Sequence, residues 1–232
     1  MSAAAWRRWL PLAGLLGLGL AVYASGLHRA LSLEALQRER AVLQELVAAC
    51  PVLAPLAFIL TYAAAAALSL PGAAFLTVVG GFLFGILLGS LWSVIGATIG
   101  AIGLFLIARS TLGAALRERA GPWLVRLEAG FRRDAFSYLL ALRLVPLFPF
   151  WLINLVPALL QVPLATFAVA TFIGIIPGSL VFASVGNGLN AVLARGGQPN
   201  LGLVLEPRIL LPMLGLSILA LLPALYRRWR QP

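Results

Sequence analysis

Long hydrophobic runs make up most of the chain, and the more polar segments between some of them contain nearly all of its arginines. The runs cover roughly residues 9–27, 51–70, 72–88, 89–108, 136–161, 164–186 and 209–226. A helix that crosses a bilayer needs about 20 predominantly apolar residues, so several runs are long enough to cross, whereas two are too short or too broken. The pattern predicts an all-α polytopic membrane protein with short hairpins between full spans.

Composition agrees with this class. Hydrophobic residues make up 62% of the chain and charged residues only 10%, against about 25% charged residues in an ordinary soluble domain. The net charge of +10 comes from 17 basic residues, all arginine, which cluster at the ends of apolar runs. They form no patch interleaved with aromatic residues, so membrane topology explains the charge better than nucleic-acid binding. The single Cys50 excludes an intrachain disulfide and a multi-cysteine metal site, and we expect neither metal nor cofactor.

The arginines also predict the orientation. Cytoplasmic loops carry an excess of arginine and lysine, and eleven of the arginines fall on one proposed side against five on the other. The eleven are Arg7, Arg8, Arg109, Arg117, Arg119, Arg126, Arg132, Arg133, Arg227, Arg228 and Arg230, and the five are Arg29, Arg38, Arg40, Arg195 and Arg208. We therefore expect both termini and loop 109–133 in the cytoplasm of a bacterial inner membrane. The first run could instead be a cleaved secretory signal.

This orientation restricts how the middle of the chain crosses. The chain is outside at 28–50 and inside by residue 109, so residues 51–88 are predicted to form a re-entrant hairpin before 89–108 crosses. Three full crossings would also satisfy the charges. By the same reasoning residues 136–161 dip in from the cytoplasm, and 164–186 cross outward.

An internal repeat favours the hairpins. A shift of 78 residues superposes Pro71, Gly96 and Gly100 on Pro149, Gly174 and Gly178. Each half then reads as an amphipathic helix, a broken hairpin and a glycine-containing span. Because the halves enter from opposite sides, they form an inverted repeat, which in transporters places the substrate near the midplane. Glycines four residues apart also let helices pack closely, within one chain or in a homodimer.

Residues 143–154 place a permanent cation, prolines and an amide inside one apolar run. A charge near the bilayer centre costs about 2.5 to 3.5 kcal/mol on insertion scales, so Arg143 is expected to face a protein interior or a wet cavity. Prolines free backbone carbonyls, which are tolerated at that depth only under protein cover.

The two hairpin tips are predicted at Pro71-Gly72 and Pro149-Phe150, where helices begin. A helix N-terminus has unpaired N–H groups and a partial positive charge, which favours anions. Arg143, Asn154 and these two helix ends are therefore a candidate site for a phosphate headgroup. Alternatively, Arg143 pairs with an internal carboxylate and braces the fold, and Asn154 only bonds a freed carbonyl.

Two carboxylates are candidates for an ion-pair partner of Arg143 or for a proton carrier. Glu39 falls within the apolar arc of an amphipathic helix at residues 31–47, and Asp134 shares an arc with Phe131. The alternative is an interfacial helix whose acid faces lipid headgroups.

The segments LPGAAFLTVVGGFLFGILLG, GATIGAIGLFLIAR, ALRLVPLFPFWLINLVPALL and ATFIGIIPGSLVFASVGNG closely resemble the SNARE-associated Golgi protein family, also called the VTT-domain family, of the DedA superfamily. The resemblance implies two facing re-entrant hairpins. It also implies the scrambling of phospholipids, as in eukaryotic relatives, or the turnover of undecaprenyl phosphate or phosphatidylethanolamine, as in bacterial relatives. Arg143 matches the first of two hairpin arginines in the DedA branch. Pro149 stands at the position of the second and Ala73 at that of an acidic residue, so the VTT branch fits better.

The expected organisation places a transmembrane helix at 1–28, an amphipathic outer helix at 29–50 and the core at 51–188. An outer loop at 189–207 and a transmembrane helix with a basic tail at 208–232 follow. We expect a lipid transporter of the scramblase or flippase type whose partners are membrane lipids. The alternatives are a secondary transporter of a small anion or solute, and a non-transporting assembly or stress-response factor. No set of residues for hydrolysis or redox chemistry is visible, so we do not expect an enzyme.

Overall fold

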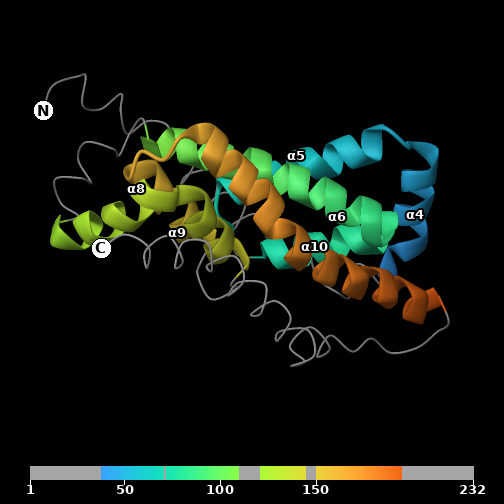
Figure 1. Ribbon diagram of the computed structural model, residues 1–232. Helices are drawn as coiled ribbons and strands as arrows, with labels where there is room; N and C mark the ends of the chain where they lie inside the picture. Colours follow the sequence, from blue (N-terminus) through green and yellow to red (C-terminus); the bar gives the residue numbers. More distant parts are fainter. Residues whose placement is uncertain (1–37, 71, 110–120, 145–149, 195–232) are drawn as a thin grey trace, which may run out of the picture.

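The computed structural model of the protein describes residues 38–70, 72–109, 121–144 and 150–194 (Figure 1). All regular secondary structure in these segments is helical. The helices are α4 (Arg40–Ala49), α5 (Leu53–Ala67), α6 (Ala73–Ile107), α8 (Gly121–Leu144), α9 (Phe150–Leu159) and α10 (Leu164–Ala194). Two of them, at Ala74–Ile107 and Leu164–Leu193, are long and apolar enough to cross a membrane. The spans expected at 1–28 and 208–232 lie outside the described residues.

The first half of the core is a hairpin followed by a span. Helix α5 has 15 residues, which is short of the about 20 that a full crossing needs. Helix α6 is interrupted at Gly85, where φ is 78° and ψ is −178°. A Cβ added at Gly80 would lie 3.1 Å from the carbonyl oxygen of Gly89, although nine residues of continuous helix would separate the two by about 13 Å. The chain therefore reverses at Gly85, as the hairpin interpretation requires.

The second half repeats this plan. Helix α8 is interrupted at Asp134, with φ −154° and ψ 70°, and its second part ends at Leu144. Helix α9 returns and ends in a corner where Gln161 has φ 54° and its N–H donates to the carbonyl of Ala158. Helix α10 then begins at Leu164 and continues to Ala194, six residues beyond the end expected for the core.

The starts of the helices match in the 78-residue register. The start of α10 at Leu164 corresponds to residue 86, directly after the reversal at Gly85, and the start of α9 at Phe150 corresponds to Gly72. Beyond Gly85, α6 and α10 run side by side in opposite directions, and the two hairpins point toward each other from opposite ends (Figure 1). The fold is thus an inverted repeat, as the sequence predicted.

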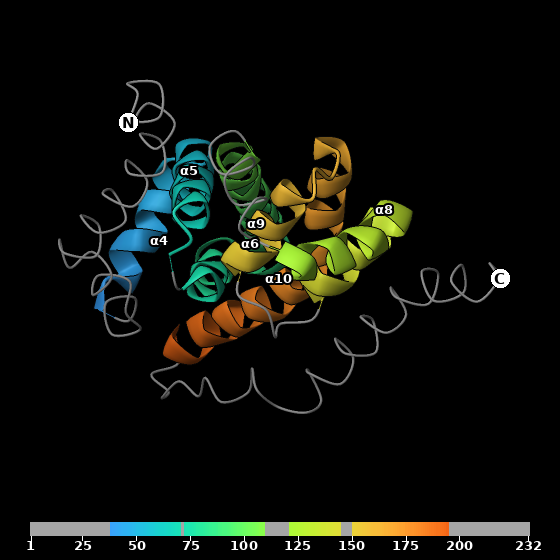
Figure 2. The same ribbon diagram turned by 90° about the vertical axis from the view of Figure 1, so that its left-hand side faces the viewer.

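The two central helices join the halves. In the view of Figure 2, α4 and α5 lie on the left and α8 on the right, with α6 and α9 near the middle and α10 running obliquely across the view. Glycines bring the backbones into contact: the positions of Gly81 and Gly186 leave no room for a Cβ against Ala183 and Val78. Gly96 packs in the same way on Tyr62 of α5. These glycines serve packing within one chain.

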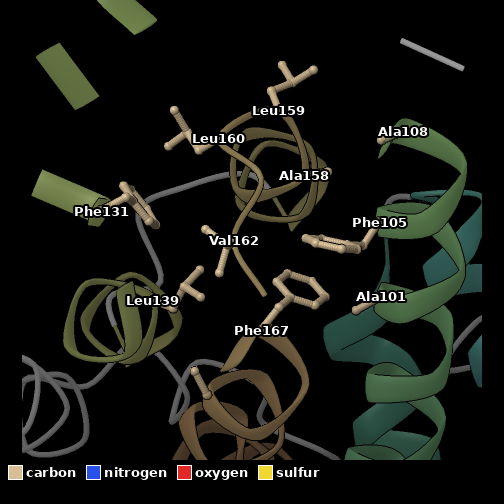
Figure 3. Packing of buried hydrophobic residues seen from close by; sticks show 11 residues of the cluster. Ala101, Phe105, Ala108, Phe131, Leu139, Ala158, Leu159, Leu160, Val162 and Phe167 are labelled. Atoms are coloured by element: carbon tan, nitrogen blue, oxygen red, sulfur yellow. The ribbon is translucent and has the colours of Figure 1, made fainter. Parts of the chain in front are cut away.

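Apolar side chains fill the space at the base of the second hairpin. Phe105 of α6 stacks on Phe167 of α10 with ring centroids 4.4 Å apart (Figure 3). Leu139 of α8 and Leu159 of α9 belong to the same buried cluster, and Phe150 packs against this cluster and against the one around the first hairpin. The beginning of α9 therefore lies where the two halves meet.

Helix α4 lies outside this core. It has no buried residue, its apolar Val42 and Leu46 are 58% and 56% exposed, and it meets α5 at a bend of 115°. A helix with exposed apolar residues beside a membrane core is typical of one lying in the interface. Residues 29–37 of the amphipathic outer helix expected at 29–50 lie outside the described residues, and the side of the membrane on which it lies stays a prediction.

Candidate functional site

Arg143 lies in the last turn of α8, just before the tip of the second hairpin. The residue is only 8% exposed, and its aliphatic stem packs against α10 at Gly174. The hairpin therefore turns the arginine toward the protein interior, as expected for a charge in an apolar run.

Two neutral side chains bind the guanidinium group. Its Nη2 donates to the Asn154 Oδ1 of α9 at 2.5 Å and to the Thr171 Oγ1 of α10 at 2.9 Å. Its central carbon lies 5.0 Å from the ring centroid of Phe150 and 5.5 Å from that of Phe167, within the range of a cation–π interaction. Three helices thus converge on one cation.

These contacts leave several buried donors without a partner. Nε and Nη1 of Arg143 and Nδ2 of Asn154 are buried and make no hydrogen bond. Each unsatisfied buried polar group costs about 1 to 3 kcal/mol, and more when it is charged. All three groups are donors, so the site has the chemistry to bind an oxyanion.

Neither candidate carboxylate is bonded to this cation. Within the described segments the salt-bridge partner of Glu39 is Arg38, and Asp134 accepts hydrogen bonds from Ser137 at the start of the second part of α8. The described residues show no ion pair with Arg143, so the bracing pair considered from the sequence is not seen among them.

The helix end at Gly72 has the open geometry expected of a hairpin tip. Gly72 caps α6 in a left-handed conformation, with φ 119°, and has no side chain that could bond the first N–H groups of the helix. Gly72 is exposed. Of the other three tip residues, Phe150 begins α9, and Pro71 and Pro149 lie outside the described residues.

The structure adds Thr171 and Phe167 to the site residues expected from the sequence, and it brings Gly174, expected only as a repeat and packing position, against Arg143. Thr171 and Gly174 lie three residues apart on α10 and therefore on one face, which is the face that meets Arg143. In the sequence, Thr171 stands out only as a polar residue one turn before a glycine in an apolar span. That feature does not indicate that Thr171 binds Arg143.

Comparison with known proteins shows the family to which the chain belongs. The family model for the VTT domain matches residues 70–188. Transmembrane protein 41B of Gallus gallus is 30% identical over 176 residues, which cover 74% of this chain and 63% of that protein. The Homo sapiens protein of the same name is 28% identical, with 74% of this chain and 58% of that protein covered.

A more distant organism gives a similar match. The transmembrane protein 41 homolog of Dictyostelium discoideum is 32% identical over 166 residues, which cover 70% of this chain and 48% of that protein. The chain thus spans between about half and three fifths of the length of these relatives. No solved structure matches it.

Proposed function

Since this chain belongs to the VTT-domain family and is a membrane protein, we propose that it moves phospholipid or polyprenyl-phosphate headgroups between the two leaflets. It does so without catalysing a reaction. The fold has the two facing hairpins that the family resemblance implied, and transfer of lipids is the activity that the same resemblance suggested.

The three unpartnered donors around Arg143 are the observation that carries this proposal. A lipid phosphate has several acceptor oxygens and a negative charge, so it would satisfy Nε and Nη1 of Arg143 and Nδ2 of Asn154 together. The main barrier to lipid transfer is the loss of water around the headgroup in hydrocarbon. Hydrogen bonds supplied along the way lower that barrier.

The position of the site fits this role. Arg143 is held where the beginning of α9 meets both halves of the repeat, between elements that enter from opposite ends. A headgroup bound at this point would lie between the two hairpins. Apolar residues on the outer faces of the molecule, such as Leu87 and Ile173, are 77% and 43% exposed and suit contact with acyl chains.

The test is a leaflet assay in proteoliposomes with phospholipids labelled on the acyl chain. Wild-type protein should expose inner-leaflet label to an external quencher, and Arg143→Gln should reduce the rate to that of protein-free vesicles. Arg109→Gln is the matched control, because Arg109 is an exposed arginine at the end of α6. If Arg143→Gln transfers lipid as fast as wild type, the proposal is wrong.

A small anion could use the same donors, so secondary transport is the second candidate. It predicts uptake of a radiolabelled oxyanion such as phosphate into sealed vesicles, whereas lipid transfer requires no ion gradient. A non-transporting assembly or stress-response factor would show neither activity, and Arg143 would be dispensable for it.

A further inference from the structure

The unpartnered groups around Arg143 are all hydrogen-bond donors. Nη2 of Arg143 already donates to the two acceptors at the site, the Oδ1 of Asn154 and the Oγ1 of Thr171. The buried Nε and Nη1 of the arginine and Nδ2 of the asparagine have no partner among the described residues. Because Thr171 accepts here, the hydrogen of its own hydroxyl is left for another acceptor. The site therefore presents N–H and O–H groups from three helices, α8, α9 and α10.

The site also carries a positive charge that no described carboxylate balances. Arg143 cannot lose its proton, and it is buried beside Asn154, which has no exposed surface. Within the described segments the one salt bridge joins Arg38 to Glu39. A buried charge is costly unless it is paired and fully hydrogen-bonded. When no lipid phosphate is bound, Arg143 therefore still requires a negative partner.

The chemistry of these groups favours a small anion over water. A water molecule brings two hydrogens of its own to a place where the unpartnered groups are already donors, and it leaves the charge of Arg143 uncompensated. A monatomic anion accepts hydrogen bonds from several directions and balances the charge. The rings of Phe150 and Phe167 lie 5.0 and 5.5 Å from the guanidinium carbon. Such apolar surroundings favour chloride, which loses its hydration water more easily than phosphate or sulfate.

We propose that, between rounds of lipid transfer, a chloride ion is bound at this site as the counter-ion of Arg143, with Nδ2 of Asn154 and the hydroxyl of Thr171 as further donors. The arriving lipid phosphate displaces the ion, so the charge of Arg143 stays balanced throughout. Chloride thereby competes with lipid and slows transfer. The inference rests on the proposed function and deepens it, because it adds a regulating ion to the same site.

The first test measures ion binding without lipid transfer. Purified full-length protein in a gluconate buffer is titrated with radiolabelled chloride, and the bound label is counted after rapid gel filtration. Wild type should bind about one chloride per chain at saturation, and its thermal unfolding midpoint should rise with chloride, because a ligand of the native state stabilises it. Arg109→Gln, which removes an exposed arginine at the end of α6, should behave like wild type.

Two substitutions locate the ion. Asn154→Asp places a carboxylate against Arg143 and should abolish both chloride binding and the effect of chloride on thermal unfolding, while the protein stays folded. Thr171→Val removes only the hydroxyl and should weaken chloride binding by about tenfold, the usual effect of one hydrogen bond to a charged group. Thr171→Ser keeps a hydroxyl and should bind chloride like wild type.

Transfer is then measured in proteoliposomes with chloride or gluconate on both sides. Wild type should transfer labelled phospholipid more slowly in chloride, and Thr171→Val should lose this difference. Chloride binding by a wild-type protein that transfers no lipid in either salt would defeat the proposed function and leave the ion assigned. The inference is overturned if chloride binding is not saturable, if Asn154→Asp binds chloride as wild type does, or if lipid moves equally fast in both salts. Accumulation of labelled chloride inside sealed vesicles would also overturn it, because chloride would then be a transported solute.

Discussion

Gly174 gives the stem of Arg143 the space that it occupies. A Cβ at Gly174 would lie 2.6 Å from Cβ of Arg143 and 3.1 Å from its Cγ. The contact fixes how closely α8 approaches α10, and with it the position of Thr171, which accepts a hydrogen bond from the same arginine. A glycine that makes no polar contact therefore positions the cation.

Replacement of Gly174 by alanine should displace Arg143 and slow lipid transfer. Overpacking a tight contact costs about 1 to 3 kcal/mol, so the midpoint of thermal unfolding in detergent should also fall. Gly188→Ala is the matched control, because no atom lies within 4 Å of its added Cβ. Wild-type transfer by Gly174→Ala would show that the position of Arg143 is not critical.

Replacement of Asn154 by aspartate should cancel the positive charge of Arg143 without unfolding the protein. In Asn154→Asp the new acid would lie at the position of the Oδ1 that now accepts from Arg143 at 2.5 Å. The resulting buried ion pair leaves no net charge for a phosphate, so transfer should fall as far as in Arg143→Gln. Thermal stability should not decrease, because the arginine gains a partner of opposite charge.

Asn190→Asp is the control for this change. Asn190 accepts a hydrogen bond from Nε of Arg40 at 2.6 Å, so the same substitution beside an arginine is made far from the tip of the second hairpin. Lipid transfer should stay at the wild-type rate. Equal losses in the two variants would mean that an added carboxylate reduces transfer wherever it lies beside an arginine, and would contradict a localised site.

Physical reasoning from the sequence was sufficient to predict that Arg143 is buried in the protein. It was not sufficient to predict every residue that binds it. Arg143 cannot lose its charge, so within an apolar run it must face the protein interior. Asn154 and Phe150 could be expected beside it because they lie on the other arm of the same hairpin. The sequence signal at Thr171 did not indicate that it binds Arg143. A threonine in a helix can satisfy its hydroxyl by bonding the carbonyl four residues back, as Thr98 does with Val94.

The structural roles of individual glycines could not be predicted from the sequence either. The spacing of Gly85 and Gly89 suggested a packing pair, but Gly85 has a positive φ and forms the reversal of α6, while Gly89 packs against Gly80. A kink and a close approach both favour glycine, so composition cannot distinguish them. The outer loop was expected from residue 189, but α10 continues to Ala194, and Asn190 within it bonds Arg40 of α4.

Gly85→Ala should destabilise the first hairpin through the backbone alone. Its conformation, with φ 78° and ψ −178°, is accessible almost only to glycine, so alanine there costs about 1 to 3 kcal/mol. The nearest atom to an added Cβ is 3.9 Å away, so no clash contributes. Gly103→Ala is the control. The nearest atom to its added Cβ is also 3.9 Å away, but Gly103 has no positive φ, so this variant should unfold at the wild-type temperature. Equal unfolding temperatures for both variants would contradict the reversal.

The inverted repeat makes a prediction about the two hairpin bases that does not depend on which face is cytoplasmic. Cys50 lies at the α4–α5 corner and Gln161 at the α9–α10 corner, so a membrane-impermeant maleimide should reach them from opposite sides. In sealed vesicles of uniform orientation, wild type and Cys50→Ser/Gln161→Cys should show opposite requirements for permeabilisation. The arginine distribution further predicts that Cys50 labels from outside the cell. Cys50→Ser alone should not react. Labelling of both corners from one side would mean that the two hairpins enter together, and the midplane site could not then connect the leaflets.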